Sequence, residues 1–413
     1  MRRVNVVAFA ATVALGFLAA FALPASAQTG VTAFEGARLI VGDGGAPIEN
    51  AVLLVDGARI VAAGRAADVS VPAGAARVSL AGKTVMPMLI DTHVHLSPTR
   101  DAIMRDLQRR AYFGVSAALS LGMDNYGLLD IRGQTIPGAA RFFSAGRGIT
   151  MPEPGRITVP HWITTEAEGR KAVQELAEKK VDIVKVWVDD RAGQFKKLTP
   201  EFYGAIIEVA HKHGLRVTAH VFNMDDAKGL IRAGVDAFAH GVRDKDIDEE
   251  MVALYKLHPG MVVNPNLPDR GVKTDLSWLR PAFPAAELEK LEKANIDRPR
   301  EQLFHAIQAR NLAKINAAGV RIVLGTDGNR AWRPHLQMED MVLARMTPMQ
   351  VIVASTRNAA EFLHMTDAGT LEAGKSADFM VLDANPLDDI TNTRRISTVI
   401  LRGAPVDRAQ PAY

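Results

Sequence analysis

The stretch VMPMLIDTHVH, residues 85–95, is the part of the chain from which the fold can be worked out. It is an apolar, strand-like run that ends in two histidines, His93 and His95, separated by one residue. Residues i and i+2 of a strand point to the same face, so both imidazoles could reach one metal ion. A His-x-His pair also occurs by chance on protein surfaces. The pair therefore predicts a metal site only if further ligands follow other strands.

Lys185 lies inside a second such run, VDIVKVWV, which is rich in β-branched residues. A lysine buried in a strand is costly unless it is paired or chemically altered. One interpretation is a lysine that extends its amine to solvent from the strand end. The other is a lysine carbamate, formed with carbon dioxide, which would be an anionic ligand able to bridge two cations. The strand-end histidines favour the carbamate.

Three more candidate ligands close apolar runs. His220 ends LRVTAH, His240 ends VDAFAH, and Asp327 ends VRIVLGTD. Imidazole and carboxylate are common ligands of zinc and similar ions. Taken singly, each histidine is better explained as a hydrogen-bonded core residue, and Asp327 is as readily explained as a helix N-cap. The joint occurrence of all six residues, each at a strand end, predicts a two-metal site.

The strand-like runs also predict an α/β fold. Helical patterns such as 165–180 and 200–213 alternate with them. Eight alternating units indicate a (β/α)8 TIM barrel, whose active site lies at the carboxyl ends of the strands. The eight candidate strands end near His95, Leu121, Gly146, Val188, His220, His240, Asn264 and Asp327.

Short alternating strands separated by Gly, Asp and Pro turns occupy both ends of the chain. We expect them to join in a small composite β-sandwich domain, made of residues 28–84 and 366–413. The barrel is then expected over residues 85–365. The segment 265–300 reads as an insertion after the seventh strand, which could form a lid or a contact in a homo-oligomer.

The N-terminus predicts export. Arg2 and Arg3 precede an apolar run over 6–23, and a small-x-small site follows with cleavage after Ala27. Residues 1–27 are therefore expected to be a bacterial signal peptide, and the mature protein to be periplasmic or secreted. An uncleaved membrane anchor is the alternative, because the run is slightly long. The absence of cysteine excludes disulfides, thiolate metal ligands and a lipoprotein anchor.

Composition limits the partners. The chain is 48% hydrophobic and 23% charged, which is typical of a globular protein, and its formal charge is only +3. No nucleic-acid footprint is visible in so balanced a sequence. A small-molecule substrate is the expected partner.

The chain resembles the metal-dependent amidohydrolase superfamily, most closely its imidazolonepropionase-like branch. The resemblance runs from about residue 36 to 406 and rests on the six candidate ligands together with AGRGIT (145–150), AGVD (233–236) and GTLEAGKSAD (369–378). It implies two divalent metal ions, with zinc as the default over manganese, cobalt or iron.

The resemblance also implies a role for each ligand. His93 and His95 would bind the more buried metal, and His220 and His240 the second. Lys185, N6-carboxylated, would bridge the two. Asp327 would bind the buried ion and act as the catalytic residue that shuttles a proton.

The reaction expected from this set is hydrolysis of a carbon-nitrogen bond by a metal-bridging hydroxide. Small substrates such as an N-acyl amino acid, a dipeptide or a cyclic amide would suit it. An esterase or lactonase using the same site is an alternative, as is a non-catalytic metal-binding barrel. A deaminase is disfavoured by Lys185, because deaminases of the superfamily generally use one metal without the bridging lysine.

Substrate recognition departs from the family pattern. Relatives often carry Gly-Gly-His after the third strand, whereas this chain has MPEPGR at 151–156 and lacks that histidine. Arg156 and Arg243 are candidates to grip a substrate carboxylate through a two-pronged contact. The favoured alternative is that both are solvated loop arginines, because exposure is the default for arginine.

The carbamate hypothesis makes a direct prediction. Lys185→Ala should abolish hydrolysis, because an alanine cannot provide the anionic bridge, and an added short carboxylate should restore part of the activity. Steady-state assays with and without the carboxylate would check this. Wild-type activity in the unsupplemented variant would contradict the assignment.

Overall fold

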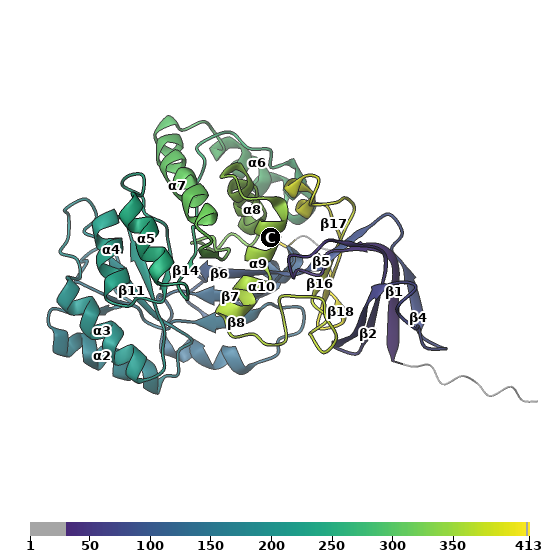
Figure 1. Cartoon of the computed structure of the whole chain (residues 1–413), viewed down its shortest axis with the longest axis horizontal. Coiled ribbons are helices and arrows are strands. Elements are labelled where there is room, and N and C mark those ends of the chain that lie inside the picture. The colour runs from purple at the N-terminus through teal and green to yellow at the C-terminus, as the bar shows by residue number, and fades with distance from the viewer. Residues whose placement is uncertain (1–29, 410–411) are drawn as a thin grey trace, which may run out of the picture.

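The computed structural model describes residues 30–409 and 412–413 (Figure 1). The predicted signal peptide, 1–27, lies outside the described residues. Within the part that is described, no helix is both long enough and apolar enough to cross a membrane.

The stretch 85–95 contributes to two sheets. β5 (Thr84–Pro87) pairs antiparallel with β16 (Phe379–Leu382), whereas β6 (Leu89–Val94) pairs parallel with β7 (Val115–Ser120). Pro87 has no N–H to extend the first ladder, and at Met88 the chain changes partners. The prediction of one continuous strand over this stretch is therefore wrong. The stretch is instead the covalent junction between the two parts of the molecule.

Parallel strands make up the larger part. One sheet has the order β6-β7-β8, and the other the order β10-β9-β11-β12-β13-β14-β15. A strand is present at each of the eight predicted positions, and β9 and β10 are additional. The remaining bounds are β8 (Arg141–Ser144), β9 (Ile149–Thr150), β10 (His161–Trp162), β11 (Val184–Val188), β12 (Val217–Val221), β13 (Ala237–Phe238), β14 (Val262–Val263) and β15 (Arg321–Ile322).

Backbone hydrogen bonds connect the two parallel sheets at both edges. On one side the Thr92 N–H donates to the Leu324 carbonyl at 2.9 Å, linking β6 to the segment after β15. On the other the Asp182 N–H, just before β11, donates to the Ser144 carbonyl of β8 at 3.0 Å. The carboxyl ends of the strands consequently face a common space.

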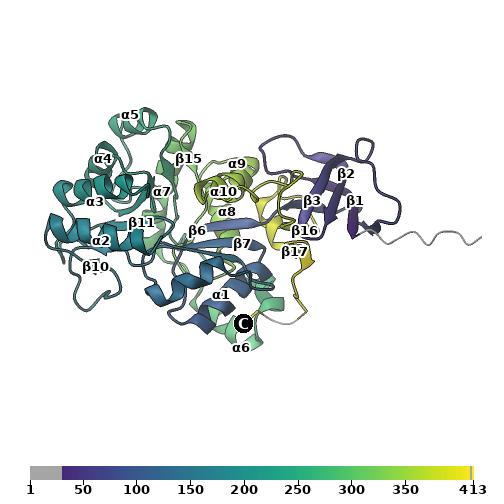
Figure 2. The ribbon, with the colours of Figure 1, turned by 90° about the horizontal axis from the view of Figure 1, so that it is seen from below.

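Helices follow the strands and cover them. In Figures 1 and 2 α2–α5 gather at the end of the molecule away from β1–β4. α2 starts at Thr165, whose side chain forms a reciprocal capping box with Glu168. The helix bounds are α1 (Arg100–Tyr112), α2 (Glu166–Glu178), α3 (Pro200–Lys212), α4 (Met224–Arg232), α5 (Glu249–Leu257), α6 (Ala285–Ala294), α7 (Pro299–Ala317), α8 (Arg333–Leu343), α9 (Pro348–Ser355) and α10 (Arg357–Phe362).

Both chain ends build one further sheet, with the order β18-β17-β16-β5-β1-β2-β3 and β4 paired to β1. Phe379 of β16 is buried and meets the ring of Phe34 of β1 edge-on, with centroids 5.1 Å apart. Within residues 30–409 these strands form one hydrogen-bonded sheet. The other bounds are β1 (Val31–Leu39), β2 (Ile48–Asp56), β3 (Arg59–Arg65), β4 (Ala76–Ser79), β17 (Ile396–Leu401) and β18 (Ala404–Pro405).

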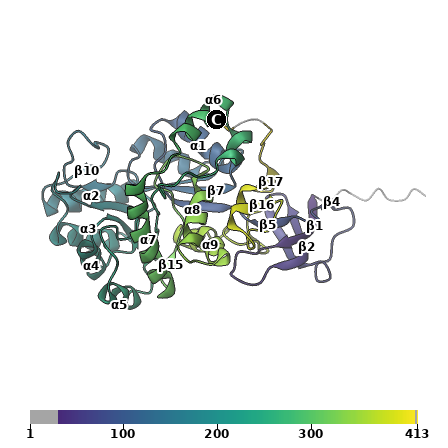
Figure 3. The same ribbon diagram turned by 90° about the horizontal axis from the view of Figure 1, so that it is seen from above.

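The predicted insertion, 265–300, contains the 3-10 helix η2 (Ser277–Ala282) and α6. The part of this segment between η2 and α6 packs against the C-terminus of the chain. Phe283 stacks on Tyr413 with ring centroids 4.1 Å apart, and Figure 3 shows α6 beside the C-terminus. The start of the insertion, Leu267 to Asp269, borders a cavity described below.

The composite sheet should be part of the cooperative fold. Phe379→Ala removes a fully buried ring that joins the two chain ends, so we expect a loss of about 3 kcal/mol in the free energy of unfolding. Val61→Ala, at a 44% exposed position of β3 in the same sheet, is the control and should cost less than about 0.5 kcal/mol. Denaturant unfolding would measure both. Equal, small effects would mean that the sheet contributes little to stability.

Candidate metal centre

Three of the predicted ligands meet directly. The Nε2 atoms of His93 and His95 lie 3.2 and 3.0 Å from the same oxygen of Asp327, Oδ1. Ligand atoms of all three residues lie within 4.8 Å of one another. His93, on β6, and His95, which directly follows the strand, therefore face one point, as expected from their spacing.

The backbone of Asp327 is built for this contact. Its φ is 50°, in the left-handed region that non-glycine residues seldom adopt. The turn lets its N–H donate to the His93 carbonyl at 2.8 Å while the carboxylate reaches back across to the histidines. Its side chain is 34% exposed, so the carboxylate also borders open space.

The remaining histidines adjoin this group. His240 Nε2 lies 3.6 Å from Asp327 Oδ2, and its ring centroid is 4.9 Å from that of His93. The His220 ring is 4.6 Å from the His240 ring. Burial lowers the pKa of His220 to about 3 and lowers those of His93 and His240 well below the usual value. These rings are therefore neutral, the form in which imidazole binds metals.

Lys185 is fully buried on β11. Within the described residues its Nζ has no hydrogen-bond partner, and the nearby Trp187 ring centroid is 5.3 Å away. Burial lowers the pKa of the amine to about 7, so a large fraction is uncharged at neutral pH. A buried amine without a partner is costly, which makes this lysine suited to chemical alteration.

Second-layer hydrogen bonds orient two of the rings. His93 Nδ1 lies 3.0 Å from the Ala239 carbonyl and can only donate to it, which leaves the lone pair on Nε2. His220 Nε2 lies 2.8 Å from Asp189 Oδ2 and 3.1 Å from Arg191 Nη1; the closer contact, to the carboxylate, requires a proton on Nε2 and leaves the lone pair on Nδ1. Partners of this kind hold metal-ligating histidines in the correct tautomer. The unpartnered Nε2 of His93, buried beside Asp327, fits a metal ion.

Asp189 was not among the predicted residues, although it follows the strand of Lys185. It accepts from His220 and, at 2.5 Å, from the Arg191 guanidinium. Burial opposes its ionisation, but hydrogen bonds from His220 and the Arg191 backbone hold the pKa of Asp189 below its usual range. The rule that picked out Asp327, a carboxylate directly after a buried strand, would also have found Asp189.

A second missed carboxylate supports Asp327. Asp91 is completely buried on β6 and accepts from the Thr326 hydroxyl at 2.7 Å and the Thr326 N–H at 3.2 Å. Burial raises the pKa of Asp91 to about 6, against the opposing charge of Arg110, whose Nη1 is 3.8 Å away. Gly325 is required here, because a Cβ would lie 1.9 Å from the Asn264 amide.

The two predicted substrate arginines lie in different settings. Arg156 is paired with Glu153, a buried carboxylate that also lies 3.5 Å from Arg191. Arg243 follows β13 and borders a cavity of about 350 Å³ together with Asn266 and Asp327. Both assignments stay predictions, but only Arg243 shares a cavity with a candidate ligand.

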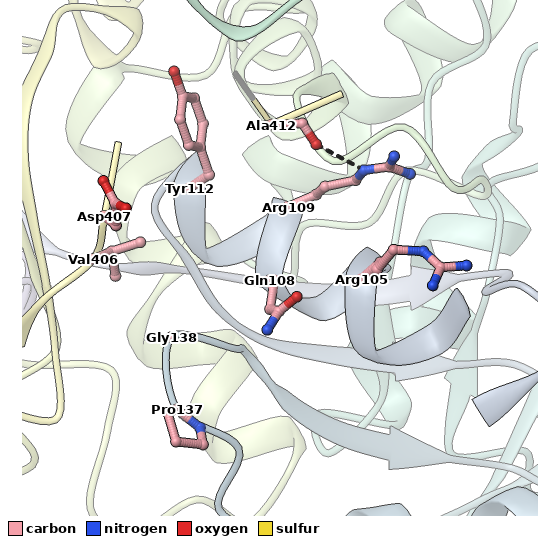
Figure 4. Close-up of a pocket in the computed structure, with 9 residues that line it drawn as sticks. All are labelled: Arg105, Gln108, Arg109, Tyr112, Pro137, Gly138, Val406, Asp407 and Ala412. Carbon is pink, nitrogen blue, oxygen red and sulfur yellow. Dashed lines mark hydrogen bonds between the residues drawn. The ribbon is translucent and has the colours of Figure 1, made fainter. Parts of the chain in front are cut away.

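A larger cavity, of about 440 Å³, lies elsewhere and contains none of the six ligands. Figure 4 shows Arg105, Arg109 and Tyr112 of α1 on one side and Asp407 on another, with Arg109 donating to the Ala412 carbonyl at 2.9 Å. Size alone therefore does not identify the functional site.

Comparison with known proteins identifies the family. Residues 84–406 match the model of the amidohydrolase family. An uncharacterised protein of Mycobacterium tuberculosis is 26% identical over 353 residues, covering 80% of this chain and 88% of the relative. The imidazolonepropionase of Agrobacterium fabrum is 27% identical over 386 residues, covering 83% and 86%.

Among solved structures, a putative prolidase from Bifidobacterium longum superposes with a TM-score of 0.76 at 25% identity, over 93% of this chain and 96% of that one. The family match spans most of the chain and includes every candidate ligand. The chain belongs to the amidohydrolase family, in its imidazolonepropionase-like branch.

Proposed function

We propose that this protein is a binuclear metal-dependent amidohydrolase that cleaves an amide or peptide-like carbon-nitrogen bond of a small substrate. The observation that carries the proposal is the convergence of His93, His95 and Asp327 within 4.8 Å, with the rings of His240 and His220 alongside. Membership of the amidohydrolase family supports a hydrolase acting on carbon-nitrogen bonds in general. N-acyl amino acids, dipeptides and cyclic amides are the proposed substrate classes.

The donor set suits two divalent cations, and zinc is the proposed ion. His93 and His95, with Asp327, would hold one cation, and His220 and His240 the other. Lys185, carboxylated on Nζ, would bridge them, and its unpartnered, buried amine supports this role. When bound, such ions lower the pKa of a shared water and polarise a carbonyl.

Asp327 is the proposed proton carrier. Its carboxylate is the one ligand that borders the 350 Å³ cavity, so it can face both the attacking water and the substrate. It would accept a proton from the water and deliver it to the leaving nitrogen, which must be protonated before it departs. His93 and His95 keep the carboxylate in place for both transfers.

The finer architecture is also proposed. The hydrogen bonds at both edges of the parallel sheets support a closed (β/α)8 barrel over residues 85–365. The sheet shared by both chain ends supports a composite domain of residues 28–84 and 366–413, with a sandwich arrangement as in related enzymes. Export to the periplasm or outside the cell, after removal of residues 1–27, rests on the sequence pattern alone.

Hydrolysis of amides can be tested directly. Leader-free protein loaded with zinc and supplied with bicarbonate should release amine from a panel of dipeptides, N-acyl amino acids and lactams. A chelator should abolish the release and added zinc should restore it. The proposed reaction needs a divalent cation to lower the pKa of the attacking water and to polarise the carbonyl.

The outcomes of this panel separate the candidate functions. Turnover of aryl esters without turnover of amides would replace the proposal with an esterase or lactonase. Bound metal with no turnover of any substrate would indicate a non-catalytic binding protein.

Asp189 should tune metal affinity through His220. Asp189→Asn removes the charge that holds the His220 tautomer, so we expect about 10- to 100-fold weaker binding of one of the two metal equivalents. Asp190→Asn is the matched control, because among the described residues the Asp190 carboxylate accepts from the Gly193 N–H, at 3.1 Å, and from none of the candidate ligands. Metal titration followed by elemental analysis would measure both variants. Unchanged affinity in Asp189→Asn would show that the contact has no role in metal binding.

A further inference from the structure

The cavity beside Asp327 contains a cation without a matching anion. The Nε atom of Arg243 is buried and has no hydrogen-bond partner in the part of the chain that the structure describes. Among the same residues no carboxylate lies within 4.0 Å of its guanidinium. A buried charge is rarely left unpaired in a folded protein.

The other charged side chains at this cavity are mostly committed. Asp269 pairs with Arg298 at 2.5 Å, and Arg333 lies 3.7 Å from the buried Asp340. Arg330, exposed at the rim, resembles Arg243 in having no carboxylate within 4.0 Å in residues 30–409 and 412–413. Two cations therefore face the cavity with no carboxylate within 4.0 Å of either among the described residues.

The carboxylates that act on Arg243 from a distance are also engaged. They are Asp327 and Asp189. Asp327 is held by His93 and His95, and Asp189 by His220 and Arg191. Neither is free to turn towards Arg243.

The present contact of Arg243 is not compatible with metal binding by His240. Its guanidinium approaches Nδ1 of His240, and the Asn266 amide nitrogen lies 2.8 Å from the same atom. Arginine has only donors, so this contact places the lone pair of the ring on Nδ1. Nε2, which faces Asp327, would then carry the proton and could not be a ligand. Use of Nε2 as a ligand would leave Arg243 without an acceptor and available to the cavity.

We propose that this cavity binds a free carboxylate of the substrate, with Arg243 as the main contact and Arg330 at the entrance. The proposal rests on the amidohydrolase function above and narrows its substrate class to N-acyl amino acids or dipeptides with an ionised C-terminus. A guanidinium matches a carboxylate with two parallel hydrogen bonds, which fixes orientation as well as charge. A volume of about 350 Å³ suits a molecule of that size.

The test compares each substrate as the free acid and as its C-terminal carboxamide. In the wild-type enzyme kcat/KM should favour the acid. Arg243→Met should lower kcat/KM for the acid by about 100-fold and leave the carboxamide within about threefold, because truncating one partner of a buried charge pair is costly. For the free acid, kcat/KM of Arg243→Lys should fall between the values of the wild type and of Arg243→Met. Arg310→Met, which removes a surface arginine paired with Asp246 on the loop that follows Arg243, is the matched control and should resemble the wild type.

Binding provides a readout that does not depend on turnover. Calorimetric titration with L-leucine and with L-leucinamide should show preferential binding of the free acid by the wild type and loss of that preference in Arg243→Met. Metal content and thermal unfolding of each variant would establish that the site and the fold are intact.

The outcomes distinguish this proposal from the function on which it rests. Hydrolysis of acid and carboxamide at equal rates, with equal binding of leucine and leucinamide, would overturn the carboxylate site and leave the amidohydrolase function standing. Absence of amide hydrolysis, with leucine still bound in preference to leucinamide, would overturn the amidohydrolase function and leave the carboxylate site standing. An equal loss for both substrates in Arg243→Met, together with loss of metal, would show that Arg243 supports the metal site and not the substrate, and would also overturn the proposal.

Discussion

The site depends on the attachment of the Asp327 turn to strand β6. Asp91, fully buried in β6, accepts two hydrogen bonds from Thr326, and the N–H groups of Thr326 and Asp327 both donate to the His93 carbonyl. These contacts join residues more than 230 positions apart and set the distance between Asp327 and the His-x-His pair. Burying the Asp91 carboxyl completely costs free energy, and its hydrogen bonds from Thr326 offset that cost.

The residues that hydrogen-bond to the candidate histidines then determine which ring nitrogens can act as ligands. Ala239 and Asp189 accept from one nitrogen of His93 and His220 respectively, which leaves the other nitrogen free. His240 is different, because Arg243 and Asn266 both approach its Nδ1 with donors. In its present position beside His240 Nδ1, Arg243 opposes metal binding by that ring. Metal binding by His240 would remove this contact and leave the Arg243 guanidinium available to the cavity. Metal occupancy and substrate recognition are thereby expected to be linked through one side chain.

The composite sheet has a structural relation to this chemistry. β5 and β6 are adjacent in sequence, so the sheet built from both chain ends leads directly into the strand that carries His93 and is followed by His95. The tail of the chain adds β16 alongside β5, and the Asp378 carbonyl accepts from the Met88 N–H at 3.1 Å at the point where β5 gives way to β6. The two ends of the chain thus support the start of the first ligand-bearing strand.

The sequence by itself determined the positions of the parallel strands along the chain and the identities of the candidate ligands. Apolar runs that end in His, Lys or Asp are local patterns, and parallel strands with alternating helices bring such ends to one edge. The eight strand positions and the meeting of His93, His95 and Asp327 could be predicted for that reason.

Only the tertiary structure decided how the local patterns are partnered. The break at Met88 depends on a strand nearly 300 residues away, and no periodicity in residues 85–95 indicates it. The pairing of Arg156 with Glu153 is likewise a property of loops brought together by the fold, as is the lack of a carboxylate near Arg243 among the described residues. Local sequence specifies which groups a strand or loop carries, whereas burial and the nearest opposite charge, which determine what those groups can do, arise from packing between distant segments.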